Sequence, residues 1–244
     1  MLYFLTSSPC MPDHVRLNPA NGFVNELRKR LPQPCSLLYI CSDPDDPESS
    51  DRYSAEMRDG SQQRGFVFSD FQVLDRRNDT EAGGLMEKAD VVLLAGGHVP
   101  TQNRYFAEIG LDRLLQDYKG VVIGVSAGTM NSAKLVYAQP EREGEAISTD
   151  FQRFLPGLGL ADIMILPHYQ QIKHNVLDGL RLFEDITYPD SEGRCFYALP
   201  DGSYLFGHDG VEELRGEAYR IKDGRLEQIS KEGDILLLKQ ADKG

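Results

Sequence analysis

The chain has 244 residues, 41% of them hydrophobic and 26% charged, which is typical of a folded globular protein and excludes a mainly disordered one. Its formal net charge of −12 opposes binding to phosphate backbones and anionic membranes, so we expect neither nucleic acid nor a membrane as a partner. No apolar run approaches the about 20 residues that span a bilayer, and residues 1–5 lack the basic flank and length of a signal peptide. We therefore expect a soluble, cytoplasmic protein.

Apolar runs and helical periodicity predict alternating strands and helices along the first half of the chain. Strands are predicted at 2–5, 36–41, 71–74, 90–94 and 120–125. Helices are predicted at 22–31, from the acidic loop 43–48 to about residue 64, and at 83–89, 105–118 and 127–137. Strands separated by helices pair in parallel, because a parallel crossover needs a dozen or more residues.

The second half of the chain has a different pattern of predicted elements. A polar connection at 139–160 has a length that is typical of a lid or binding loop. Two β-hairpins are predicted near the C-terminus, at 194–199 with 203–206 and at 219–222 with 225–229, each with an Asp-Gly turn. We expect one α/β domain over residues 1–244, a parallel sheet flanked by helices with C-terminal β-hairpins.

No motif for a cofactor or metal is present. The sequence contains neither G-x-G-x-x-G nor a P-loop, no histidine pair has H-E-x-x-H spacing, and the acidic loop lacks the pattern of a calcium loop. The four cysteines form no C-x-x-C pair, which favours reduced thiols; they are Cys10, Cys35, Cys41 and Cys195. We expect no cofactor and no metal ion.

The strongest local signal is the G-x-S-x-G pattern around Ser126, from Gly124 to Gly128, between an apolar strand and a predicted helix. Small residues are needed there because larger side chains would collide with the neighbouring backbone of such a sharp turn. The turn exposes the Ser126 hydroxyl and directs the Ala127 N–H toward an oxyanion. The alternative is an ordinary turn in which Ser126 caps the helix.

A serine nucleophile needs a base, normally a histidine that a carboxylate orients. Among the five histidines, His14, His98, His168, His174 and His208, we favour His168, which follows the apolar segment 164–166. A parallel sheet would bring the end of that strand beside Ser126. His174 falls on a predicted helix at 170–182, and His208 is the competing base or a turn residue. Gly96-Gly97, after the strand at 90–94, offers the Gly97 N–H as a second oxyanion donor, or forms a tight turn only.

Three blocks together resemble the serine-peptidase family of dipeptidase E (aspartyl dipeptidase) and cyanophycinase: 93–97 (LLAGG), 120–128 (GVVIGVSAG) and 166–169 (LPHY). The resemblance covers most of the chain and implies a fold similar to class I glutamine amidotransferases. It implies Ser126 as nucleophile, His168 as base, and the backbone of Gly97 and Ala127 as oxyanion donors. It also implies a small peptide or amide as substrate.

The resemblance further implies a triad acid in the segment 199–203 (LPDGS), where Asp201 stands in place of the family's usual Glu. Asp190 and Glu192 are reserves, and Asp201-Gly202 is also compatible with a simple turn. An α/β-hydrolase esterase would instead have the order Ser, acid, His and would use His208. A ligand-binding relative without catalysis is the other alternative.

An aspartyl preference would require a cation in the acyl pocket. The candidates are Arg104, Arg142, Arg153, Lys173 and Arg181, and none lies on a family motif. The sequence leaves the acyl preference and the oligomeric state open, a homodimer included. His98, beside Gly97, lines the pocket or belongs to a loop.

Overall fold

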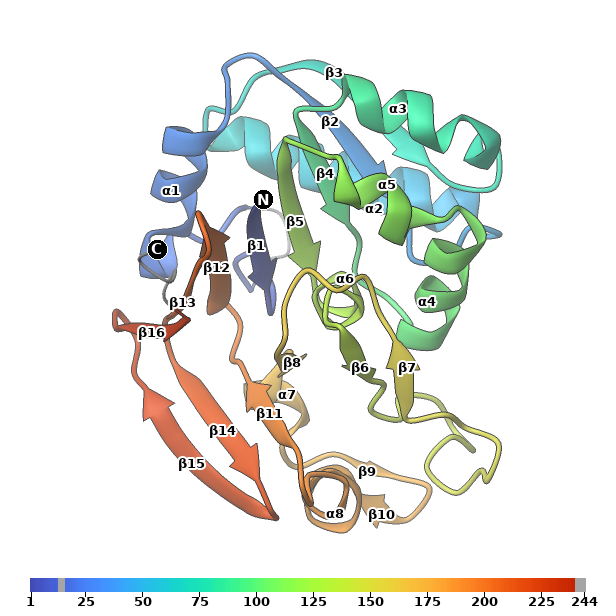
Figure 1. The fold of residues 1–244 in the computed structure, drawn as a ribbon, viewed down its shortest axis with the longest axis vertical. Helices are drawn as coiled ribbons and strands as arrows, with labels where there is room; N and C mark the ends of the chain where they lie inside the picture. Colours follow the sequence, from blue (N-terminus) through green and yellow to red (C-terminus); the bar gives the residue numbers. More distant parts are fainter. Residues whose placement is uncertain (13–15, 240–244) are drawn as a thin grey trace.

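The computed structural model describes residues 1–12 and 16–239, which form two sheets and two short hairpins (Figure 1). The larger sheet has eight strands in the order β16-β13-β12-β1-β5-β4-β2-β3. Five of them pair in parallel: β1 (Leu2–Thr6), β2 (Cys35–Ile40), β3 (Phe68–Leu74), β4 (Val91–Leu94) and β5 (Val121–Val125). Antiparallel strands extend the sheet beyond β1: β12 (Tyr204–His208), β13 (Val211–Arg215) and β16 (Ile235–Lys239). The mainly parallel α/β fold predicted from the sequence is therefore correct.

Helices connect the parallel strands and cover both faces of the larger sheet. One face carries α1 (Phe23–Arg30) and α2 (Pro47–Gln63), because Leu27 and Met57 line one apolar cavity together with Leu93 and Ile123 of the sheet. Figure 1 shows α3 and α5 on the opposite, nearer face. The helices between β3 and β5 are α3 (Ala82–Lys88), α4 (Val99–Glu108) and α5 (Leu111–Gln116).

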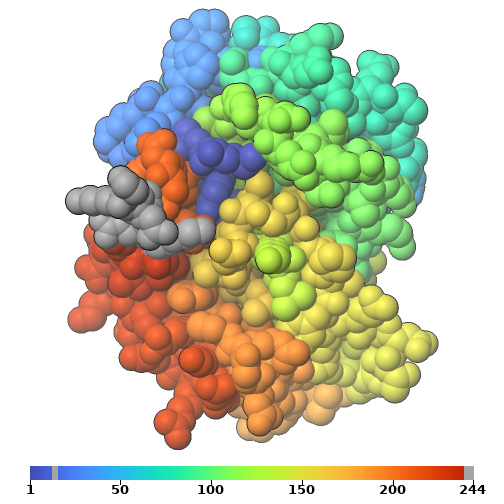
Figure 2. Space-filling model, in the orientation of Figure 1, coloured from blue at the N-terminus to red at the C-terminus, as the bar shows by residue number. Residues whose placement is uncertain are grey.

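The smaller sheet belongs to the second half of the chain. Its order is β15-β14-β11-β8, with β8 parallel to β11 and the other pairs antiparallel. The strands are β8 (Met164–Leu166), β11 (Cys195–Ala198), β14 (Ala218–Lys222) and β15 (Arg225–Ser230). In Figure 2 most of this half of the chain, yellow to red, forms the lower part of the visible face.

Short elements complete the lower part. Two hairpins pair β6 (Leu135–Tyr137) with β7 (Phe154–Pro156) and β9 (Val176–Leu177) with β10 (Leu180–Arg181). The helical segments are α6 (Ala127–Asn131), α7 (Tyr169–Ile172), a π-helical turn at Leu182–Thr187 and α8 (Tyr188–Asp190), and short 3-10 turns lie at Ala20–Gly22 and Asp79–Glu81. Two apolar clusters fill the interior, one around the larger sheet and one between α6, the smaller sheet and the π-helical turn. None of the helices in the described ranges has the length and apolar character needed to cross a membrane.

Several predicted elements are corrected. The helix predicted at 105–118 is two helices, separated at Gly110, whose φ of 63° is left-handed. The helix at 127–137 ends at Asn131, because the next residues pair with 154–161 instead. The helix at 170–182 ends at Ile172, and a β-hairpin follows.

The two C-terminal hairpins have different outcomes. Strands β14 and β15 form the hairpin predicted at 219–229. The one predicted around Asp201 is wrong, because β11 lies in the smaller sheet and β12 in the larger. The segment 199–203 therefore passes from one sheet to the other instead of folding back on itself.

Candidate active site

The carboxyl ends of three neighbouring strands of the larger sheet meet at one place. Ser7 follows β1, Gly97 follows β4, and Ser126 follows β5. Open α/β sheets bind ligands at this edge. His168 reaches the same edge from β8 of the smaller sheet, so its position beside Ser126 does not come from a shared parallel sheet, as the sequence suggested.

Ser126 lies at a strained turn between β5 and α6. Its φ of 50° and ψ of −109° are unfavourable for a residue with a side chain and are typical of a serine at a sharp strand-to-helix turn. Its main-chain N–H donates to the carbonyl oxygens of Thr6 and Ser7 at 3.2 Å, which fixes the turn against the end of β1.

Two glycines let the turn pack closely. A Cβ atom at Gly128 would lie 2.3 Å from the carbonyl oxygen of Leu94, and one at Gly124 would lie 2.9 Å from Thr129 Oγ1. The spacing of small residues in G-x-S-x-G therefore has the steric cause expected from the sequence.

His168 forms hydrogen bonds through both ring nitrogens. Its Nε2 lies 2.9 Å from Ser126 Oγ, and its Nδ1 lies 2.7 Å from Asp201 Oδ1. Because an ionised carboxylate only accepts hydrogen bonds, Nδ1 carries the proton and Nε2 is free to accept from the serine hydroxyl. The main-chain N–H of His168, whose φ is 57°, donates to Ser7 Oγ at 2.7 Å.

Asp201 accepts four side-chain hydrogen bonds. Besides His168, the donors are Ser7 Oγ at 2.9 Å to Oδ1, and Gln170 and Gln171 through Nε2 at 2.6 Å to Oδ2. Burial raises the pKa of Asp201, but the bonds from His168, Ser7 and Gln170 outweigh burial and hold this pKa below its usual value. The carboxylate is therefore ionised at neutral pH.

The other predicted acids and bases lie elsewhere. Asp190 binds Arg153 at 3.0 Å and accepts from Tyr137, and Glu192 is exposed. His208 stacks on Phe206 and lies 3.6 Å from Asp209 and 3.7 Å from Glu213. His174 is an exposed turn residue, and His14 lies outside the described residues.

The two predicted oxyanion donors flank Ser126. Gly97 has a φ of 153°, is exposed to the cavity, and leaves no room for a side chain, because a Cβ atom there would lie 2.2 Å from Ser42 Oγ. Ala127 is the first residue of α6, so its N–H has no acceptor within the helix. The Cβ position of neighbouring Gly96 is 3.4 Å from Ser126 Cβ, so both turns lie in contact.

His98 anchors the start of the 139–160 connection over this edge. Its Nε2 lies 2.8 Å from Glu145 Oε1, and its Nδ1 lies 2.8 Å from Thr101 Oγ1. The second oxygen of Glu145 accepts the main-chain N–H groups of Glu141 and Arg142. One histidine thus links the Gly97 turn to residues 141–145.

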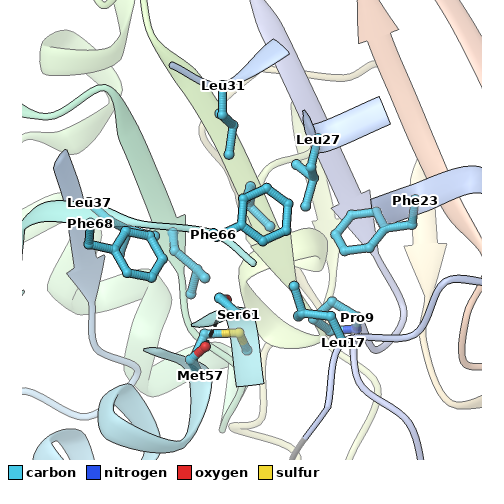
Figure 3. Close-up of a pocket in the computed structure, with 12 residues that line it drawn as sticks. Pro9, Leu17, Phe23, Leu27, Leu31, Leu37, Met57, Ser61, Phe66 and Phe68 are labelled. Atoms are coloured by element: carbon cyan, nitrogen blue, oxygen red, sulfur yellow. Dashed lines mark hydrogen bonds between the residues drawn. The ribbon is translucent and has the colours of Figure 1, made fainter. Parts of the chain in front are cut away.

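Ser126 and His168 lie where two cavities meet. One, of about 280 Å³, has walls that include Met130, Glu141 and Leu182, and the other, of about 540 Å³, extends past Gly97 and Arg142. A third cavity, between α1, α2 and the larger sheet (Figure 3), is apolar and has only about 20 Å³, so it admits no more than a water molecule.

Of the five candidate cations, only Arg142 lines these cavities. The other three arginines form ion pairs and belong to neither cavity lining, and Lys173 approaches the ring of Tyr169. Those ion pairs are Arg104 with Glu108, Arg153 with Asp190, and Arg181 with Asp185.

Sequence reasoning missed several residues of the site. Ser7, Gln170 and Gln171 bind Asp201, Glu145 holds His98, and Glu141 lines the smaller cavity. Gln170 and Gln171 lie directly after the L-P-H-Y block, a proximity that the sequence offered as a signal. The others depend on contacts between distant parts of the chain.

Comparison with known proteins agrees with the fold. The fold is similar to the crystal structure of a peptidase from an acI-B1 Actinobacterium, with 15% identity, a TM-score of 0.64 and coverage of 97% of this chain and 96% of that one. It is also similar to the crystal structure of a putative peptidase E protein from Listeria monocytogenes EGD-e, with 18% identity, a TM-score of 0.58 and coverage of 94% and 98%. Curated proteins give no match. The model of peptidase family S51 matches residues 4–214, so the chain belongs to peptidase family S51.

Proposed function

We propose that this chain is a serine peptidase that cleaves short peptides or other small amides through an acyl-enzyme on Ser126. The observation that carries the proposal is the unbroken line of hydrogen bonds from the Ser126 hydroxyl through His168 to Asp201. Family membership supports peptidase activity in general, and the geometry supports the serine type.

In the first half of the reaction, Ser126 Oγ attacks the substrate carbonyl carbon while His168 Nε2 accepts the hydroxyl proton. The negative charge that develops on the carbonyl oxygen is stabilised by the N–H groups of Gly97 and Ala127. When the C–N bond breaks, the proton on Nε2 passes to the leaving amine. The Asp201 carboxylate holds the ring tautomer and stabilises the imidazolium.

In the second half, a water molecule attacks the acyl carbon, His168 again accepts a proton, and Ser126 regains it when the acid product leaves. No group other than these side chains and water is needed for the balance of protons. The strained backbone of Ser126 supports this role, because such a turn exposes the hydroxyl.

The shape of the site supports small substrates. The reacting groups lie at the junction of cavities of about 280 and 540 Å³, which are sizes that enclose one or a few residues. Residues 139–142 form part of the walls. We therefore propose a dipeptidase-like specificity for size, and we expect folded proteins to be cleaved much more slowly than dipeptides.

The test is intact-mass spectrometry after treatment with a small fluorophosphonate, which detects an activated serine without knowledge of the substrate. We expect one adduct on the wild type, none on Ser126→Ala, and strongly reduced labelling of His168→Ala. His208→Ala is the matched control and should label like the wild type. Absence of an adduct on the folded wild type, together with no cleavage of a dipeptide library, would favour a binding protein; loss of labelling in His208→Ala alone would favour the esterase order.

A further inference from the structure

The cavity of about 280 Å³ beside Ser126 has mostly apolar walls and one carboxylate. Met130, Ile172, Leu177 and Leu182 contribute apolar surface, and Ser126 and His168 form its reactive end. Apart from His168, Glu141 is the only titratable residue in the described lining, and no Lys or Arg belongs to it.

Glu141 has a fixed main chain and a free side chain. Its N–H donates to Glu145 Oε2 at 2.8 Å, and Glu145 is in turn held by His98. Within the described ranges, no hydrogen bond or ion pair engages the Glu141 carboxylate. The loop therefore presents an unpaired acceptor to the cavity that contains the nucleophile.

The groups around Glu141 do not fully compensate the negative charge of its carboxylate. Burial, followed by repulsion from Glu145, raises the pKa of Glu141 to about 7, although Arg142 and His168 act in the opposite direction. Glu141 is solvent-exposed, and a cation in the cavity would favour its ionised form. An acidic group would meet the opposite force.

The charged side chains that line the adjoining cavity of about 540 Å³ are also mainly negative. Asp43, Asp46 and Glu56 line it, and Arg142 is its only described arginine or lysine. A substrate carboxylate beside Ser126 therefore finds few positive partners, whereas a positive group is favoured on both sides.

We infer that Glu141 binds a positively charged nitrogen of the substrate in the smaller cavity, so that the enzyme selects peptides by a cationic group close to the scissile bond. The inference rests on the proposed function, since it assigns a substrate class to the same site. Two sources supply this nitrogen: the α-ammonium group at the start of the peptide, or the side chain of a basic residue.

Four matched substrates with leucine as the leaving residue separate the two sources. Lysyl-leucine has both nitrogens, norleucyl-leucine only the α-ammonium, aminohexanoyl-leucine only the side-chain amine, and hexanoyl-leucine neither. We expect kcat/KM to fall at least about tenfold when the nitrogen bound by Glu141 is removed. Loss from lysyl- to aminohexanoyl-leucine identifies the α-ammonium, and loss from lysyl- to norleucyl-leucine identifies the side chain.

In the Glu141→Gln variant, removal of the nitrogen should no longer lower kcat/KM, because the amide keeps the shape of the side chain but not its charge. Glu143→Gln is the matched control. It removes the same charge from a position two residues away that is exposed like Glu141 but lines neither cavity, so kcat/KM should still fall when the nitrogen is removed. If kcat/KM in Glu141→Gln still falls by the wild-type factor when the nitrogen is removed, the inference is overturned.

Binding measurements separate this inference from the proposed function. Calorimetric titration of Ser126→Ala with the same four compounds does not require catalysis. If no substrate is cleaved and no fluorophosphonate adduct forms, the serine-peptidase proposal fails. The ammonium site is still supported if compounds without the nitrogen bind more weakly and if this difference disappears when Glu141→Gln is added. Equal binding of all four compounds would refute it.

Discussion

The hydroxyl of Ser7 donates a 2.9 Å hydrogen bond to Asp201 Oδ1, the same oxygen that His168 Nδ1 contacts at 2.7 Å. Ser7 Oγ also accepts the main-chain N–H of His168. Because Ser7 directly follows β1, which is paired with the strand that leads to Ser126, it connects the larger sheet to a histidine from the smaller one. We assign Ser7 as a positioning residue.

Replacing Ser7 with Ala removes both bonds and leaves the ring of His168 and the Asp201 carboxylate less well oriented. We predict a fall in kcat of about tenfold with little change in KM, the size expected for a hydrogen bond to a charged group. Loss of the Ser7 donor should also raise the pKa of Asp201, so that activity declines at a less acidic pH than in the wild type. Steady-state kinetics across pH would measure both effects. An unchanged kcat and an unchanged acid limb would mean that Ser7 is structural only.

Asp201 should contribute more than any of its neighbours. We predict that Asp201→Asn lowers kcat by about 10³–10⁴-fold, as when the acid of a serine triad is replaced by its amide, because the wrong imidazole tautomer is then stabilised. Asp201→Glu, which restores the residue type common in the family, should recover part of the activity. Equal loss in both variants would show that a carboxylate one methylene longer cannot replace Asp201.

The same carboxylate predicts a pH dependence of stability. The pKa of Asp201 is lower in the folded protein than its ordinary value, so its interactions stabilise the fold above the ordinary carboxyl pKa of about 4 and lose this effect as the pH falls further. The difference in unfolding free energy between wild type and Asp201→Asn should therefore shrink below about pH 4. Urea titrations at several pH values would test this, and a difference that grows on acidification would contradict it.

The pair of His98 and Glu145 should control the loop that carries Glu141 and Arg142. We predict that His98→Ala and Glu145→Gln each raise KM more than they lower kcat, because the loop walls move while Ser126, His168 and Asp201 stay in place. Since the two residues share a contact, the loss in the double variant should be smaller than the sum of the losses in the two single variants. Additive effects in this cycle would show that the residues act independently.

The candidate site was predictable where its chemistry is local. The G-x-S-x-G segment carries its own steric reason, seen in the close approach of Gly128 to Leu94. His168 was the right neighbour of Ser126 for a wrong reason, since β8 belongs to another sheet. The contribution of Ser7 depends on contacts over 161 and 194 positions in the chain, and no periodicity encodes such distances.

In the fold, too, the elements set by local sequence were predictable and those set by long-range contacts were not. The alternation of strands and helices up to β5 follows from apolar runs and their spacing, and the predicted boundaries mostly agree within three residues. The helix predicted over 127–137 fails because Lys134 and Ala138 donate their N–H groups to Ala161 and Arg153. These long-range partners replace helical hydrogen bonds, and helix propensity alone contains no information about them.

Two glycine substitutions should have opposite effects on stability. Gly84→Ala lies within α3 with a negative φ and nothing within 4 Å of the added Cβ, so we predict stabilisation by about 0.4–1 kcal/mol through the unfolded state. Gly128→Ala places its Cβ 2.3 Å from the main-chain oxygen of Leu94, which only a backbone shift can relieve, and we predict destabilisation by about 1–3 kcal/mol or more. Urea unfolding measures both changes in free energy. The dependence of the unfolding free energy on urea concentration should match that of the wild type if the denatured state is unchanged. If Gly128→Ala were as stable as the wild type, the close contact between α6 and β4 would not exist as described, and the position of Ser126 at the start of α6 would lose its steric explanation.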